Sequence, residues 1–455
     1  MDIFGVRSLP FSTRRNYYYE FKHLLPWSVL AGLVEGQFAS VVVSKTFQGS
    51  DFLIAVATAT PFAAYIFSLL WGMLCVGRAK VRLAVLFGAG TALCAGLAGA
   101  VPAEPRGVLW FMASIAAAQV LLAGVVTVRS AIWRANYPHS VRGQIAARLQ
   151  AVRSIISVVT VQAAAAWCDQ HPDAYRFVFP IAAVCGAVGV VVLTRLHIRG
   201  ERGELRRATR TLDGDLREGT FEPYNLTALL SPGHIFRETS RILRKDWRFR
   251  RYCVGQFLQG AANLMTISVV VAIVSRDLQL PDDRGFWISS GLIVALPVLS
   301  LLASIRRWGR LFDSLGVLRF RVVNVMCWAA SLFFGLLATL VTVYASAIGA
   351  TFFPLAILLF ALRGILHGVS QGGGTLAWNL GHLHFARPEE AEMYMGIHVF
   401  LAGVRGLIAP LGGMWLWANF GWGVWIIALA LNFTGLFFYH SLARHEARTG
   451  PHATN

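Results

Sequence analysis

Twelve long apolar runs are the feature that most constrains the fold of this chain. A helix rises about 1.5 Å per residue, so roughly 20 residues cross about 30 Å of hydrocarbon. Lipid cannot hydrogen-bond a backbone, and the ten-residue alternation of a membrane barrel is missing from the sequence, so we expect helices. We predict an all-α membrane protein with spans near 24–46, 52–76, 83–102, 107–132, 145–167, 174–198, 252–275, 286–305, 320–345, 349–372, 394–418 and 421–443.

The composition agrees with a membrane protein and offers little support for an enzyme. The chain is 56% hydrophobic and 14% charged, outside the range of ordinary soluble domains. Its six cysteines do not suggest a disulfide framework, and we find neither a P-loop nor a nucleophile motif. His382 and His384 are close enough in sequence to share a metal, but no third ligand is evident. We expect no enzymatic activity, no cofactor and no bound metal.

An arginine-rich segment divides the runs into two sets of six. We predict an N-terminal six-helix half at 1–198, a cytoplasmic linker at 199–251 and a C-terminal six-helix half at 252–455. The linker is too short and too charged to bury a core of its own. The fifth and eleventh runs each place an arginine about ten residues beyond a glycine, Arg153 and Arg405. Such correspondences indicate two pseudo-symmetric bundles that arose by duplication.

The net charge of +18 is distributed as a topology signal. With both termini inside, most of the 41 lysines and arginines fall in cytoplasmic segments, as the positive-inside rule requires. We therefore expect both termini in the cytoplasm and the basic surface to contact anionic lipid, with no nucleic-acid partner. The preponderance of arginine over lysine hints at a high-GC bacterium, so we expect a multi-pass protein of the bacterial cytoplasmic (inner) membrane.

A short motif follows the eighth run. Gly309, Leu311, Asp313, Gly316 and Arg319 match G-x-L-x-D-x-x-G-x-x-[RK]. This pattern, together with the twelve runs and the long central loop, resembles the major facilitator superfamily. The equivalent stretch after the second run is shorter and has no acid.

The resemblance implies a fold of two six-helix bundles and a gating role for this motif. In that family the acid and the basic residues tie the cytoplasmic helix ends together in the outward-facing state and release them in the inward-facing state. Gly309, Asp313, Gly316 and Arg319 are the residues to which this role would apply. An ordinary tight turn with solvated charges is the alternative, and we expect any latch to rest mainly on the C-terminal half.

Charged and polar residues at membrane depth are expensive and suggest function. Glu35 is the only acid that we place in the middle of a span, and Gln37 lies beside it. Glu35 is a candidate for a proton-coupling carboxylate or a substrate contact; the alternative is a structural ion pair with an arginine from another helix.

The tenth span carries a polar stripe. Arg363, His367 and Gln371 recur every four residues and so share one helix face, which we expect to line the pathway. Arg405, in the eleventh span, is a further candidate, although pairing within the core is at least as favoured. Gln119 and Asn263 could hydrogen-bond a solute or equally join helices.

Two other arginines within spans, Arg129 and Arg153, lie nearer the membrane surface. Snorkelling of their guanidinium groups to the interface is the favoured interpretation of both.

These features favour a secondary active transporter that moves a small polar or anionic organic solute by alternating access, with protons as the candidate coupling ion. We expect the protein to act as a monomer. A drug or metabolite exporter of the same superfamily is the main alternative, and a non-transporting membrane sensor is a less favoured one.

Overall fold

The computed structural model describes residues 9–74, 78–198, 201, 240–278, 280–281, 283–348, 352–385 and 391–449. The first half contains α1 (Phe11–Glu35), α2 (Phe38–Lys45), α3 (Asp51–Ala63), α4 (Ser68–Leu74), α5 (Lys80–Gly99), α6 (Gly107–Asn136), α7 (His139–Gln170) and α8 (Tyr175–Leu193). The second half contains α12 (Trp247–Ala272), α13 (Gly285–Ser290), α14 (Leu296–Ile348), α15 (Phe353–Leu380), α16 (Ala391–Phe420) and α17 (Gly423–Thr449). Most of the 199–251 linker lies outside the described residues.

The helices account for the predicted membrane spans. Among the described residues, nine helical segments are long and apolar enough to cross a membrane, or ten if α1 and α2 are taken as one bent span. One of these segments, Gly285–Ala345, covers the places of the predicted eighth and ninth spans, and a shorter apolar helix at Asp51–Phe67 lies at the second. The prediction of an all-α membrane protein is confirmed, and the arrangement is consistent with twelve spans.

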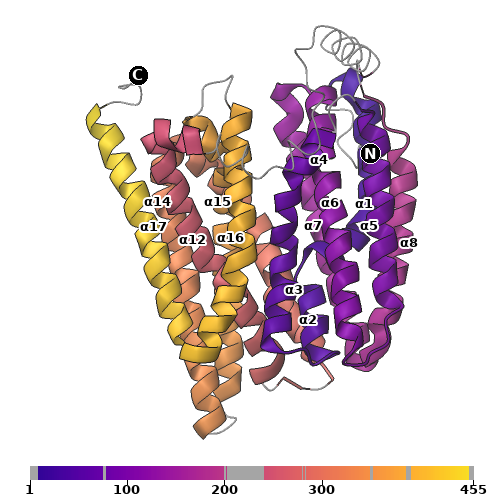
Figure 1. Ribbon diagram of the computed structural model, residues 1–455, viewed down its shortest axis with the longest axis vertical. Coiled ribbons are helices and arrows are strands. Elements are labelled where there is room, and N and C mark those ends of the chain that lie inside the picture. Colours follow the sequence, from indigo (N-terminus) through magenta and orange to yellow (C-terminus); the bar gives the residue numbers. More distant parts are fainter. Residues whose placement is uncertain are drawn as a thin grey trace.

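The two halves pack their helices in the same way. In the first half α1 packs against α7 and α8, and in the second half α12 packs against α16 and α17. An indole repeats the correspondence: Trp71 donates from Nε1 to the Val120 carbonyl at 2.9 Å, and Trp308 donates to the Val369 carbonyl at 2.7 Å. Figure 1 shows the two bundles beside each other, with indigo to magenta helices in one and orange to yellow helices in the other.

Small residues allow the first and last helices of a half to approach closely. On α8, Gly186 lies against the Leu30 side chain and Gly189 against the backbone near Trp27. Val184 and Val188 of the same helix are exposed, as expected for a face turned toward lipid. Close approach through glycine is a common way to pack helices where lipid tails are as apolar as leucine.

The first span is broken in its middle. α1 ends at Glu35, α2 begins at Phe38, and their axes differ by 49°. Gly36 stands at the break with an extended backbone. We expected Glu35 to lie inside a continuous helix. It lies instead at a helix end within the membrane.

The helix directions define two sides of the molecule. We call the side at which α1 begins and α17 ends the terminal side, and the side of the turn between α2 and α3 the distal side. In Figure 1 the terminal side is uppermost and α2 and α3 lie toward the bottom.

A single glycine separates the eighth and ninth spans within α14. Gly316 has φ 69° and ψ 168°, while the residues around it are helical. This backbone region is essentially restricted to glycine. The motif glycine therefore turns the chain between two membrane crossings.

We predict that Gly316→Ala lowers the apparent melting temperature of the purified protein, because alanine in this conformation costs about 1–3 kcal/mol. No atom lies within 4 Å of the position that a Cβ would take, so the cost is one of backbone conformation alone.

Gly309→Ala is the matched control for this prediction. Gly309 also has open space around it and lies in a helical stretch of the same motif, where alanine gains about 0.5–1 kcal/mol. Equal melting temperatures for the two variants in a detergent thermal-unfolding assay would contradict the assignment of strain to Gly316.

Candidate functional site

A cavity of about 340 Å³ lies mainly between helices of the second half. α12, α14, α15 and α16 form most of its wall, and Phe62 and Tyr65, in and just after α3, close it from the first half. It runs from Asn263 and His367 near the middle of their helices to Trp378 near the terminal-side end of α15. The cavity thus extends from membrane depth toward the terminal side.

Several of the predicted polar residues meet in this cavity. Asn263, His367, Gln371 and Arg405 all line it, from three different helices. The His367 ring lies edge-on to the Trp328 ring, with 4.8 Å between their centroids. A role of these residues in binding stays a prediction, but the structure brings them together.

Arg363 does not belong to this wall. It lies one helical turn before His367 on α15, is 5% exposed, and is absent from the residues that line the cavity. Its carbonyl accepts a hydrogen bond from the Ser331 hydroxyl at 3.1 Å, which joins α15 to α14. Of the three residues that we expected to share one helix face toward the pathway, only His367 and Gln371 line the cavity.

The arginine of α16 is held against α12. Arg405 donates from Nη1 to the carbonyl of Gln256 at 2.7 Å. Its guanidinium lies directly over Gly260, where even an alanine Cβ would collide with it. The position of this charge thus depends on a glycine one turn from its hydrogen-bond acceptor.

A second cavity arginine, Arg321 on α14, was missed by the sequence argument. Its residue exposure is 2%, and it donates from Nη2 to the Tyr439 hydroxyl at 2.8 Å. The guanidinium carbon lies 4.9 Å from the Tyr439 ring centroid and 5.8 Å from that of Tyr252. Arg321 is near the start of the predicted ninth span, where the positive-inside rule explains any arginine, so nothing singled it out.

The remaining predicted residues gather in the first half. Glu35 forms an ion pair with Arg153 of α7, which is the structural alternative that we had left open. Gln119 donates to the Val34 carbonyl at 2.9 Å, and Gln37 accepts from the Ser40 hydroxyl at 3.2 Å. These contacts surround the break between α1 and α2.

A small pocket next to this group shares one lining residue with the main cavity. It has a volume of about 40 Å³ and is lined by Glu35, Gln119 and Tyr65, among others. Tyr65 also lines the main cavity. Glu35 and the main cavity thus have Tyr65 as a common neighbour.

Snorkelling was the wrong interpretation of Arg153, and Arg129 also has a carboxylate neighbour. Arg153 pairs with Glu35, and Arg129 lies 3.9 Å from a carboxylate oxygen of Glu20. The Arg129 guanidinium also lies 4.8 Å from the Trp133 ring centroid. Glu20, placed outside the first span by the sequence argument, is 1% exposed, and a buried carboxylate requires such a partner.

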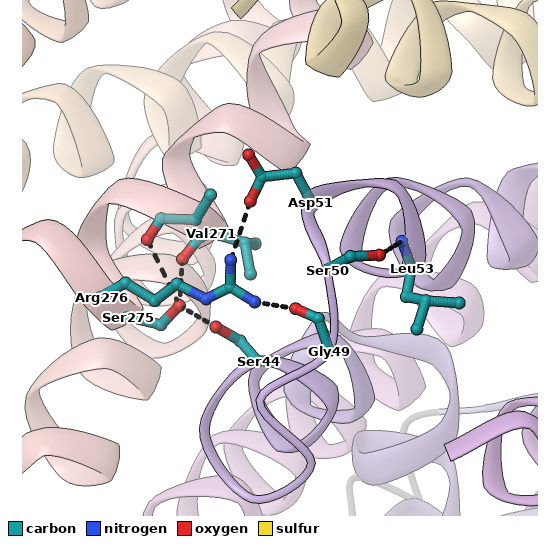
Figure 2. A network of polar contacts seen from close by, with 9 residues as sticks. Ser44, Gly49, Ser50, Asp51, Leu53, Val271, Ser275 and Arg276 are labelled. Carbon is teal, nitrogen blue, oxygen red and sulfur yellow. Dashed lines mark hydrogen bonds and ion pairs between the residues drawn. The ribbon is translucent and has the colours of Figure 1, made fainter. Parts of the chain in front are cut away.

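The two halves are joined by polar contacts on the distal side (Figure 2). The hydroxyls of Ser44 and Ser275 are 2.5 Å apart, one from each half. Arg276 pairs with Asp51, at 2.8 Å between Nη1 and Oδ1, and donates to the Gly49 carbonyl. The hydrogen bonds that the structure describes between the halves all lie on this side.

A carboxylate adds a second connection on the distal side. Asp169, at the end of α7, accepts from the backbone N–H groups of Phe286 at 2.6 Å and Trp287 at 2.8 Å. These are the first free N–H groups of α13, which carry its positive partial charge. The distal ends of the halves are therefore held by charge-assisted bonds at two places.

The motif for which we predict a gating role lies on the terminal side, and its charged residues form no latch with the part of the chain that the structure describes. Asp313 and Arg319 are exposed, and neither takes part in an ion pair between described residues. In the first half, which lacks the motif acid, Glu201 accepts from the backbone N–H of Lys80 at 3.0 Å, at the start of α5. The sequence just before α5 has no acid, and Glu201, which follows α8, supplies a carboxylate to the N-terminus of α5 instead.

The comparisons with known proteins agree with this architecture. The family model described as Major Facilitator Superfamily matches residues 27–362. No curated protein is significantly similar to the chain in sequence.

Solved structures of transporters share the fold. The nucleoside transporter NupG is 13% identical, with a TM-score of 0.61, covering 96% of this chain and 100% of its own. The xylose transporter XylE from Escherichia coli, in a partially occluded inward-open conformation, is 11% identical, with a TM-score of 0.58 and coverages of 94% and 99%. A POT family transporter in complex with 5-aminolevulinic acid is 11% identical, with a TM-score of 0.66 and coverages of 97% and 99%.

The family match extends over well over half of the sequence, and the structural likeness extends over nearly all of it. The chain therefore belongs to the Major Facilitator Superfamily.

Proposed function

We propose that the protein is a secondary active transporter that moves a small polar or anionic organic solute by alternating access. The observation that carries this proposal is the pairing of a closed distal side with a cavity that reaches toward the terminal side. A transporter needs two arrangements of its halves around one midplane site, and such a pairing is expected of one of them.

The charge distribution supports the inward-facing state as the one described by this arrangement. With the termini in the cytoplasm, as the positive-inside rule indicates, the cavity extends toward the cytoplasm. The exposed Asp313 and Arg319 fit this state, since the family motif releases its contacts when the inner side opens. The similar xylose transporter was solved in an inward-open conformation. We place the protein in the bacterial cytoplasmic membrane on the same grounds.

Protons are the proposed coupling ion. Glu35 lies at the break in the first span, beside a pocket that shares Tyr65 with the main cavity. Its partner Arg153 comes from another helix, so gain of a proton by the carboxylate would release a contact between α1 and α7. A charge change at a bent helix is a way to couple protonation to helix movement.

Export of an amphipathic metabolite is the second candidate. Aromatic side chains form much of the cavity wall: Phe62, Tyr65, Trp328 and Trp378. Such a wall suits an apolar body. Transport measured in right-side-out and inverted vesicles separates the two directions.

We predict that Arg276→Ala opens the distal side. The change removes a partly exposed ion pair and a charged hydrogen bond, together worth about 1–2 kcal/mol, or roughly 5- to 30-fold in a conformational equilibrium. A cysteine at Gln371, in a background without the native cysteines, reports access to the cavity. Its labelling by a membrane-impermeant maleimide added on the distal side of proteoliposomes should accelerate by that factor.

Arg284→Ala is the matched control for distal opening. Arg284 is also a distal arginine, but it pairs with Asp283 of the same loop, at 3.4 Å, and its side chain is 73% exposed. Its removal should leave the labelling rate unchanged. Equal rates in Arg276→Ala and the parent protein would refute the distal contact as a closure.

We predict that Glu35→Gln abolishes solute accumulation driven by a pH gradient while solute exchange across the membrane persists, because the variant keeps the side-chain shape and loses the titratable proton. The measurement is uptake and counterflow in proteoliposomes, with the solute that most stabilises the purified protein.

Arg153→Gln tests whether the ion pair or the carboxylate is responsible. It retains the acid but removes the contact that protonation would release, so gradient-driven accumulation should be lost in this variant as well, at reduced protein stability. Normal accumulation in Glu35→Gln would rule out the coupling role.

A further inference from the structure

The main cavity contains two arginines without a carboxylate. Arg321 and Arg405 both line it, and no acidic residue is among the described residues of its wall. The ion pairs described in the second half lie elsewhere: Arg248 and His384 with Glu446, and Arg284 with Asp283. The wall therefore carries an uncompensated positive charge.

The two guanidinium groups are also short of hydrogen-bond acceptors. Among the described residues, the Nε atoms of Arg321 and Arg405 are buried and have no partner. The indole N–H of Trp328, another wall residue, is buried and unpaired in the same way. Unpaired buried donors and charges cost several kcal/mol each, so the protein itself leaves part of the hydrogen-bonding capacity of these two guanidinium groups unmatched.

Both arginines are held in place by the protein alone. Arg321 is fixed by the Tyr439 hydroxyl and by the ring of Tyr252 on its other flank. Arg405 is fixed by the Gln256 carbonyl and by its contact with Gly260. A site formed before the ligand arrives loses less entropy on binding.

The rest of the wall defines the body of the ligand. Phe62, Tyr65, Trp328 and Trp378 provide flat apolar surface, and amide side chains such as Gln259 and Asn263 provide further polar contacts. A guanidinium matches the two oxygens of a carboxylate with parallel hydrogen bonds.

We propose that this cavity binds an organic anion, a molecule with an apolar or aromatic body whose carboxylate groups are bound by Arg321 and Arg405. The inference rests on the proposed function in one respect, since it names the solute class that the transporter carries. The binding site itself stands on the geometry of the cavity.

The test is binding to the purified full-length protein in detergent, measured by calorimetry and thermal stabilisation. The probes are isophthalate, which has two carboxylates on a ring, and isophthalamide, its uncharged analogue of nearly the same shape. Isophthalate should bind at least about tenfold more tightly, since each charged hydrogen bond is worth more than about a factor of ten. Equal binding of the two probes, or no binding of isophthalate, overturns the proposal.

Variants identify the residues responsible. Arg321→Gln and Arg405→Gln should each weaken isophthalate binding about tenfold or more and leave isophthalamide binding unchanged. Arg310→Gln, an exposed arginine of the same half, is the control and should bind like the parent protein. Unchanged affinity in both cavity variants overturns the assignment.

Gly260→Ala guards against variants that fail to fold. The three atoms nearest to the new methyl group all belong to the guanidinium end of the Arg405 side chain, so it should displace that charge at little cost to the fold. It should weaken isophthalate binding, whereas Gly412→Ala, at a helical glycine with open space around it, should not. Equal affinities in these two variants count against the site.

The inference and the proposed function fail in different ways. Isophthalate that binds through both arginines but is never translocated in proteoliposomes supports the site and refutes transport of this solute class. Uptake of uncharged solutes together with no preference for isophthalate over isophthalamide supports transport and refutes the anion site.

Discussion

The cost of removing charge from water is the constraint on which this structure depends. In the first half, the membrane-depth arginines Arg129 and Arg153 are each matched by a carboxylate, Glu20 and Glu35. In the second half, Arg321 and Arg405 are matched only by neutral groups of the described residues, a phenol hydroxyl and a backbone carbonyl. Two bundles with the same helix packing therefore solve the same electrostatic problem in opposite ways. The first half supplies the carboxylates for these two arginines itself, whereas the second half leaves its cavity arginines free for an anion.

The fold was largely predictable from the sequence because lipid permits so few solutions. Apolar runs of membrane length, the motif around Gly316 and the bias of basic residues all follow from constraints that act locally along the chain. The break at Gly36 was not foreseen, since a glycine in an apolar run is equally compatible with a straight helix. The break places Glu35 at a helix end, where it pairs with Arg153 of α7, and the composition of the first span does not reveal that partner.

The candidate site was predictable only in part. Polar residues in mid-span, such as His367 and Asn263, were visible because polar groups are costly at membrane depth and stand out in an apolar helix. Arg321 was hidden by its place near a span end, where basic residues are expected. The ion pair between Glu35 and Arg153 was hidden because it joins helices far apart in sequence. Sequence patterns report the depth of a residue better than they report its partner.

The distal contact in Figure 2 has two chemically different components. The Ser44–Ser275 hydroxyl pair is buried and uncharged, whereas the Arg276 and Asp51 side chains are 30% and 43% exposed. Dissolved ions screen exposed charges over about 8 Å at physiological ionic strength but have little effect on a buried dipole pair. Salt in the medium that bathes the distal side therefore acts on the rim of this closure and spares its centre. A change from a dilute to a saline medium would therefore shift the balance between a closed and an open distal side even when the solute concentrations stay the same.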